Sequence, residues 1–392
     1  MAQGRRWGLS AQTAMRFVVL LGLVSLFGDL TYEGARSITG PYLAVLGASA
    51  AVVGFTAGLG ELVGYGLRLV SGYISDRTRR YWALTLVGYA VNLLAVPALA
   101  LAGRWEVAAA FIVAERLGKA IRTPARDAML SHATRQMGRG WGFGLHEAMD
   151  QVGAVLGPLV VAGVLAAPVQ DYRRGFLVLG IPAVGALALL GLARLLYPCP
   201  QALEPQAVPL ERQGIPRRFW LYLVGASLVA FGYADFPLIA YHLQQVGRIP
   251  ASGIPLVYAT AMAVDAVAAL FFGRLFDRVG PPVLVGGALV AAFFAPLVFL
   301  GGAVAVWLGM VLWGVGMGAQ ESVMRALVAE MTPPDRRGAA YGLFNGGYGL
   351  AWFLGSVVLG ALYDRSPGAL VALSVSSQVV AVILLGALLR RR

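Results

Sequence analysis

The sequence predicts an all-α integral membrane protein with twelve transmembrane helices, arranged in two six-helix bundles with pseudo-twofold symmetry. Three observations support this fold class. Hydrophobic residues make up 58% of the 392 residues and charged residues only 13%, whereas roughly a quarter of an average soluble chain is charged. Apolar runs of about 20 residues, the length that a helix needs to cross a bilayer, recur along the whole chain. One charged loop motif also occurs twice, once in each half.

The apolar runs give six expected helices in each half. The first six lie near 15–46, 49–75, 82–102, 106–134, 140–166 and 174–197, and the second six near 218–246, 252–276, 282–302, 304–331, 338–363 and 368–389. A polar, proline-rich stretch separates the two sets and is typical of a linker. The expected organisation is therefore an N-terminal bundle over 1–197, a cytoplasmic linker over 198–216 and a C-terminal bundle over 217–392.

The repeated loop motif has the pattern Gly-x-x-x-Asp-Arg. It follows the second expected helix at Gly72, Asp76 and Arg77, and the eighth at Gly273, Asp277 and Arg278. Other glycines repeat at a constant offset, with Gly144 matching Gly342 and Gly157 matching Gly355. Parallel repeats of this kind occur in transporters that alternate access around a midplane site.

The net charge of +12 indicates membrane topology rather than nucleic-acid binding. Most arginines lie in alternate short loops, and basic residues are enriched in cytoplasmic loops; Arg104, Arg173, Arg174 and Arg248 are exceptions. We therefore expect a multi-pass, monomeric protein of a prokaryotic cytoplasmic membrane, surrounded by lipid, with both termini cytoplasmic. The single cysteine, Cys199, excludes an intrachain disulfide and a thiolate metal site.

Twelve expected helices, the 6+6 repeat and the Gly-x-x-x-Asp-Arg loops together resemble the major facilitator superfamily over essentially the whole chain. The resemblance implies a secondary transporter whose two bundles rock around a central cavity. In that family the first loop usually continues with Gly, where this chain has Arg79; the second loop keeps Gly280 but replaces the basic pair with Pro281 and Pro282.

The two loops are expected to gate the cytoplasmic side. Asp76 can pair with basic residues across the interface between the halves and hold that side shut when the cavity faces outward. The second loop lacks the trailing arginines of the first. The gate should therefore be stronger at Asp76 than at Asp277.

The fifth helix carries a glycine pattern that resembles a motif of antiporters in this superfamily. Its members are Gly144, Gly153, Gly157 and Pro158. Small residues let helices approach closely and a proline bends a helix, so generic packing is the alternative interpretation. Segments 28–37 and 116–127 also resemble prokaryotic drug or metal exporters. The resemblance thus favours export of a solute in exchange for protons.

Ionisable residues within membrane helices usually mark a substrate or ion path. A rise of about 1.5 Å per residue places Asp29 near the bilayer midplane, with Glu33 and Arg36 one and two turns further. All three share one helix face, where Arg36 can neutralise one carboxylate and leave the other to titrate. The alternative is a structural ion-pair cluster.

The fourth and fifth helices add further charges. The fourth carries a basic ladder of Arg116, Lys119, Arg122 and Arg126, and the fifth carries His146, Glu147 and Asp150. We expect Asp29, Glu33, Arg116 and Asp150 to form one charged network. Lys119, the only lysine, can lose its proton when buried or can simply pair with Glu115. No metal site is expected, although His146, Glu147 and Asp150 are weak candidates.

The C-terminal half has fewer charges. Asp235 and Asp265 lack a basic residue nearby in sequence, so they are candidates for a proton or cation site. An amphipathic pocket could use aromatic residues such as Tyr32, Tyr42, Tyr65, Phe231, Tyr233, Phe236 and Tyr241.

The expected function is alternating-access transport of a small solute, with protons as the coupling ion and no cofactor. No phosphate-binding loop is present, so transport driven by ATP within this chain is not expected, and no enzyme motif is found. Within transport, the alternatives are an anionic solute, suggested by the basic ladder, and a divalent metal ion, suggested by the carboxylates. A lipid scramblase or a membrane-embedded enzyme remains as an alternative of another class.

Overall fold

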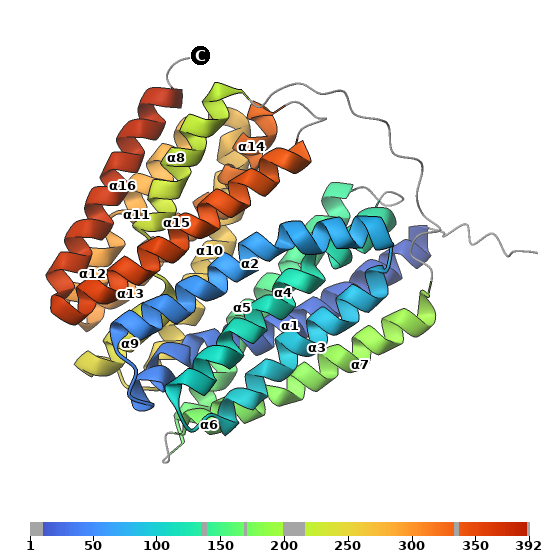
Figure 1. Cartoon of the computed structure of the whole chain (residues 1–392), viewed down its shortest axis with the longest axis horizontal. Helices are drawn as coiled ribbons and strands as arrows, with labels where there is room; N and C mark the ends of the chain where they lie inside the picture. The colour runs from blue at the N-terminus through green and yellow to red at the C-terminus, as the bar shows by residue number, and fades with distance from the viewer. Residues whose placement is uncertain (1–10, 135–138, 168–170, 199–215, 333–336, 390–392) are drawn as a thin grey trace, which may run out of the picture.

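The computed structural model describes residues 11–134, 139–167, 171–198, 216–332 and 337–389, and it is almost entirely helical (Figure 1). The N-terminal half contains α1 (Ala11–Val45), α2 (Ala50–Thr78), α3 (Tyr81–Ala98) continued by η1 (Leu99–Leu101), α4 (Trp105–Thr134), α5 (Arg139–Leu165), α6 (Tyr172–Val178) and α7 (Gly180–Leu196). The C-terminal half contains α8 (Arg217–Phe231), α9 (Phe236–Val246), α10 (Gly253–Val279), α11 (Pro282–Ala291), α12 (Phe294–Leu300), α13 (Ala303–Ala319), the π-helical turn η3 (Gln320–Met324), α14 (Arg325–Met331), α15 (Arg337–Arg365) and α16 (Pro367–Leu389).

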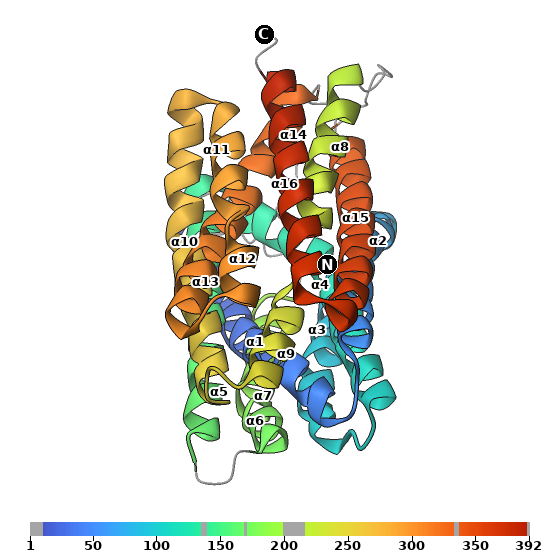
Figure 2. The ribbon, with the colours of Figure 1, turned by 90° about the vertical axis from the view of Figure 1, so that its left-hand side faces the viewer.

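These elements confirm the predicted twelve-helix membrane fold in the described residues. Eleven spans are long and apolar enough to cross a bilayer, and α4 is the twelfth helix. This helix falls outside the apolar set because it carries the basic ladder and several carboxylates along its length. Figures 1 and 2 show α1 to α7 gathered in one group and α8 to α16 in the other.

The seventh span differs from its prediction as one continuous helix over 218–246. It is interrupted between α8 and α9, where Asp235 caps the new helix by accepting a hydrogen bond from the Phe236 amide (2.8 Å). Pro237 follows in the first turn, where proline is well tolerated. Side chains of α16 satisfy carbonyl oxygens around the break: Ser374 donates to Gly232 (2.6 Å), Ser377 to Leu228 (2.8 Å) and Gln378 to Val229 (2.9 Å).

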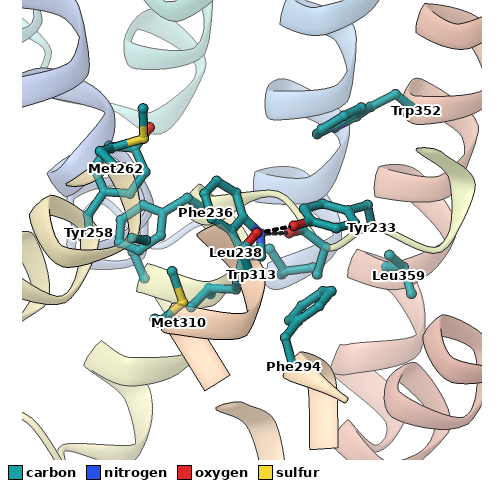
Figure 3. Packing of buried hydrophobic residues seen from close by; sticks show 14 of the residues in the cluster. Tyr233, Phe236, Leu238, Tyr258, Met262, Phe294, Met310, Trp313, Trp352 and Leu359 are labelled. Atoms are coloured by element: carbon teal, nitrogen blue, oxygen red, sulfur yellow. Dashed lines mark hydrogen bonds between the residues drawn. The ribbon is translucent and has the colours of Figure 1, made fainter. Parts of the chain in front are cut away.

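An aromatic cluster surrounds this break (Figure 3). The Trp313 indole donates to the Ala234 carbonyl (3.0 Å), and the Tyr233 hydroxyl donates to the Trp313 carbonyl. Trp352 on α15 packs beside Tyr233, with ring centroids 5.9 Å apart. These contacts fix the interrupted span against α13, α15 and α16.

The two halves meet tightly at one end of the molecule, which we call the closed end. There α1 packs on α9, and α2 packs along α15. Glycines allow the close approach, because a Cβ atom on Gly40 would overlap the Pro237 carbonyl and one on Gly58 would come 3.0 Å from the Phe353 carbonyl. The Asp364 carboxylate of α15 also accepts hydrogen bonds from the amides of Ala50 and Ala51 (3.0 and 2.9 Å), which caps α2 across the interface.

Candidate functional site

A cavity of about 1270 Å³ lies between the two halves. Its lining includes Arg68 in the second half of α2, Asp127 in the last turns of α4 and Tyr341 in the first turns of α15. The cavity therefore reaches the end of the molecule opposite the closed end, where α1 begins and α16 ends (Figure 1). We call this end the open end.

The cavity wall is rich in charged side chains. The N-terminal half contributes Asp29, Glu33, Arg36, Glu61, Arg68, Arg116, Lys119, Arg122, Arg126, Asp127, Glu147 and Asp150, and the C-terminal half contributes Asp265 and Glu321. Eight of the nine residues that the sequence proposed for coupling are therefore lining residues. The ninth, Asp235, lies in an adjoining small pocket together with Arg36, Glu61 and Arg116.

Arg36 has different partners from those that the sequence suggested. Its Nη2 lies 2.6 Å from Asp235 Oδ1 and 3.0 Å from Glu61 Oε1, so it neutralises neither Asp29 nor Glu33 by direct contact among the described ion pairs. The prediction was wrong because carboxylates on α2 and on the cap of α9 compete for the guanidinium. Asp235 is thus paired, although its basic partner lies in the other half of the chain.

Glu33 and Asp29 remain without a basic partner within the described ion pairs. The Tyr258 hydroxyl of α10 donates to Glu33 Oε2 over 2.6 Å, a further link between the halves. Asp29 is 6% exposed, and its Oδ1 has no hydrogen-bond partner among the residues that the structure describes. A buried carboxylate with a free oxygen beside a water-accessible cavity is a suitable proton-binding group.

The basic ladder on α4 is only partly neutralised. Arg116 contacts Glu115 (3.1 Å) and Glu61 (3.5 Å). Glu115 also accepts a hydrogen bond from Asn92 (2.6 Å), so the suggested pairing of Lys119 with Glu115 is not found. Lys119 Nζ instead lies 4.0 Å from the centroid of the Tyr32 ring, a cation–π contact that leaves its charge available to the cavity.

Arg122 is also held by an aromatic ring. Its guanidinium lies 4.1 Å from the centroid of Tyr89, and its Nε and Nη1 have no hydrogen-bond partner among the described residues. Arg126 contacts Asp127 (2.9 Å) and Asp150 (3.7 Å). The ladder therefore combines paired arginines with two cations, Lys119 and Arg122, that face rings.

The weak metal candidates do not converge. His146 Nε2 contacts Ser25 Oγ (3.1 Å), and its Nδ1 lies 3.4 Å from Asp150 Oδ1, whereas Glu147 is exposed. In the part of the chain that the structure describes, no three His, Cys, Asp or Glu side chains come together as metal ligands.

The glycines of the antiporter-like motif have different surroundings. A Cβ on Gly153 would lie 3.1 Å from Asp29 Cβ, and one on Gly157 would lie 2.7 Å from the Gly34 amide nitrogen, so both allow α5 to approach α1. Gly144 has no heavy atom within 4 Å of its Cβ position, and Pro158 lies inside α5. Close packing accounts for two of the four residues, and an antiport role stays a prediction.

The loop motifs lie at the open end. Arg77 donates to the Tyr73 hydroxyl of its own helix (2.7 Å), and Asp277 and Arg278 are exposed. Cβ atoms on Gly72 and Gly273 would make ordinary contacts of 3.7 and 3.9 Å. The side chain of Asp76 lies outside the described part of the chain, so the proposed gate stays a prediction.

Sequence reasoning missed several lining residues. Glu61 lies inside a predicted membrane helix. Ionisable residues in such helices usually mark a substrate or ion path, so the signal that identified Asp29 was also present for Glu61. Of the suggested aromatic residues, only Tyr32 and Tyr65 line the cavity, whereas Tyr258, Trp313, Tyr341 and Trp352 also do so. Nothing in their local sequence distinguishes these four from packing residues.

Comparisons with known proteins agree with this architecture. The Major Facilitator Superfamily model matches residues 21–356 and 236–392. An uncharacterized protein of Mycobacterium tuberculosis, Rv2265, is 42% identical over 384 residues, which cover 96% of this chain and 94% of that protein. "Multidrug resistance protein MdtH" of Photorhabdus laumondii is 26% identical over 328 residues, covering 81% of this chain and 79% of that protein.

Solved structures show the same fold at low sequence identity. The nucleoside transporter NupG has a TM-score of 0.72 at 13% identity and covers 95% of this chain and 98% of its own. A bacterial homolog of the human lysosomal transporter Spinster, in an inward-facing conformation, has a TM-score of 0.71 at 16% identity, with 99% and 96% covered. The chain therefore belongs to the Major Facilitator Superfamily and is a multi-pass secondary transporter rather than an enzyme.

Proposed function

We propose that the protein exports a small solute across a prokaryotic cytoplasmic membrane in exchange for protons. The observation that carries this proposal is the position of Asp29, a buried carboxylate with an unpaired oxygen in the wall of the cavity. Glu33 lies one turn away and bonds to Tyr258 across the two halves. Proton binding at these carboxylates would therefore change contacts between the two halves, such as the bond from Tyr258 to Glu33.

The distribution of arginines favours a cytoplasmic position for the open end. With that orientation the cavity faces inward and is ready to take up a solute from the cytoplasm. The bundles 1–197 and 217–392 would then rock about the cavity in a monomer, joined by the linker 198–216. The name of the MdtH relatives refers to multidrug resistance, which favours the outward direction of transport.

A test requires a transported solute, which a panel of labelled lipophilic cations, organic anions and divalent metal salts would identify in proteoliposomes. Asp29→Asn and Glu33→Gln should abolish the dependence of flux on a pH gradient while solute exchange without a gradient persists. Glu106→Gln, which removes an exposed carboxylate paired with Arg104, should leave the flux unchanged. Gradient-driven flux that is normal in both cavity variants would refute this assignment.

Transport of an anionic solute is the second candidate. Lys119 and Arg122 line the cavity, and their cationic groups face the rings of Tyr32 and Tyr89. A preference for organic anions in the same panel would support this candidate. Loss of that flux in Lys119→Gln would assign the anion to the basic ladder.

A further inference from the structure

The two walls of the cavity differ in charge. Every basic side chain that lines the cavity in the described residues comes from the N-terminal half. The C-terminal wall instead carries two carboxylates, Asp265 and Glu321, together with aromatic and thioether side chains that include Tyr258, Met262, Trp313 and Trp352. A solute that spans the cavity therefore meets an acidic, aromatic surface on this side.

Asp265 on α10 is the most unusual residue of this wall. It has no exposed surface, and neither carboxylate oxygen has a hydrogen-bond partner in the described part of the chain. Among the described residues, the charged side chains that act on it are carboxylates: Glu321, Glu147 and Glu33. Burying an unpaired carboxylate among like charges is energetically unfavourable, and a cation supplied from the cavity would offset that cost.

The surroundings of Asp265 suit an organic cation better than a hydrated ion. The Tyr258 and Trp313 rings lie 6.3 Å apart. Figure 3 shows Tyr258 beside Met262, which is one turn before Asp265 on α10. Aromatic faces attract desolvated organic cations. Methionine side chains are flexible, so Met262, which also lines the cavity, can adapt to the shape of a ligand.

We propose that this wall binds an amphiphilic organic cation, with the positive group at Asp265 and the apolar body against Tyr258, Trp313 and Met262. The inference names the substrate class for the cavity and rests on the proposal that the cavity carries an exported solute, but it does not depend on proton coupling. A small metal ion fits this site poorly, because the described residues bring no three His, Cys, Asp or Glu side chains together there and the rings and thioethers around Asp265 add no hard oxygen ligands.

The test uses two ions of matched shape and opposite charge. Labelled tetraphenylphosphonium and tetraphenylborate are equilibrated with the purified full-length protein without any ion gradient. We expect tetraphenylphosphonium to bind more tightly, and Asp265→Asn to weaken its binding by at least about tenfold, because the neutral amide cannot pair with the cation. Asp265→Glu, which keeps the charge, should retain binding. Glu330→Gln, which removes an exposed carboxylate of α14 outside the cavity lining, should leave it unchanged.

The outcomes separate this inference from proton coupling. Equal phosphonium affinity in wild type and Asp265→Asn, tighter binding of the borate, or binding of neither ion would overturn it. Asp265→Asn removes an uncompensated buried charge and should fold at least as stably as wild type, and Asp265→Glu supplies an independent comparison. If Asp29→Asn and Glu33→Gln keep gradient-driven flux but phosphonium binding still requires Asp265, proton coupling at those residues fails while the cation site stands.

Discussion

Arg36 Nη2 donates to Asp235 Oδ1 over 2.6 Å, and this buried ion pair joins α1 of one half to the cap of α9 in the other. The same nitrogen contacts Glu61 Oε1 of its own half over 3.0 Å. Arg36 therefore has one partner, Glu61, within its own half and one partner, Asp235, from the other half at the closed end. Such an arrangement lets the halves separate without leaving a buried guanidinium unpaired.

Asp235→Asn should weaken this contact and favour opening of the closed end. The asparagine oxygen can still cap α9, so the helix is retained while the charge is lost. In a Cys199→Ser background, Ser356→Cys provides a reporter that is buried between α2 and α15. Its labelling should accelerate about tenfold, equivalent to about 1.4 kcal/mol. Glu106→Gln, at an exposed ion pair, is the matched control, and equal labelling in both variants would show that the pair does not hold the halves together.

The glycines on α2 should also control how readily the closed end opens, because they allow α2 to pack closely on α15. A Cβ on Gly54 would overlap the Ser356 carbonyl and lie 3.2 Å from Gly360 Cα, so Gly54→Leu forces α2 away from α15. We expect faster labelling of Thr39→Cys, a reporter buried near the closed end. Gly66→Leu on the same helix, where a Cβ meets no atom within 4 Å, should not change the rate. Similar labelling rates in the two leucine variants would show that the close packing of α2 on α15 does not hold the closed end together.

The sequence predicted the spans and most of the cavity charges for a physical reason. Lipid tolerates neither exposed backbone nor unpaired charge, so apolar length sets the helices and any charge within them faces the interior. Asp29, Lys119 and Asp265 follow this rule in the structure.

The pairings could not be predicted in the same way. The partner of Arg36 depends on how two helices 199 residues apart in sequence lie side by side, which no local pattern contains. The break before α9 had a local signal, since Asp235 and Pro237 are typical of a helix start. The apolar residues on both sides nevertheless indicated one continuous helix over 218–246. The stability of the break depends on α16, far along the chain.

Ser374→Ala should destabilise the protein through this break. The Ser374 hydroxyl donates to the Gly232 carbonyl (2.6 Å) in a buried site, and its loss leaves that oxygen short of a partner. We expect a cost of about 1 kcal/mol, measured as a lower midpoint of thermal unfolding in detergent. Ser376→Ala on the same helix removes a hydroxyl that is exposed and bonds its own helix at Ala372. If both alanines have the same effect, the bond across to Gly232 contributes nothing to stability.

The two Gly-x-x-x-Asp-Arg loops end in equivalent but chemically different caps. Arg79 ends α2 with φ 53° and ψ 22°, and its amide donates to the Ser75 carbonyl (2.9 Å). Gly280 ends α10 with φ 77° and ψ −154°, and its amide donates to the Phe276 carbonyl (2.8 Å). Among the described residues, Arg79 is the only one other than glycine with a positive φ. At the cap position the first loop thus has the Arg79 side chain, whereas the second loop has Gly280 and no side chain.

Substitutions at the two cap residues should change the stability of the protein in opposite directions. A left-handed conformation costs a residue with a Cβ atom roughly 1 kcal/mol, so Arg79→Gly should stabilise the protein by up to about that amount, less the chain entropy of glycine. Gly280→Ala should destabilise by more than about 1 kcal/mol, because its φ and ψ are accessible essentially to glycine alone. Arg80→Gly removes an arginine from the same loop at φ −90° and should not stabilise. The midpoint of thermal unfolding is measured for all three variants. If Arg80→Gly stabilises the protein as much as Arg79→Gly does, the effect comes from the loss of loop charge and not from backbone strain.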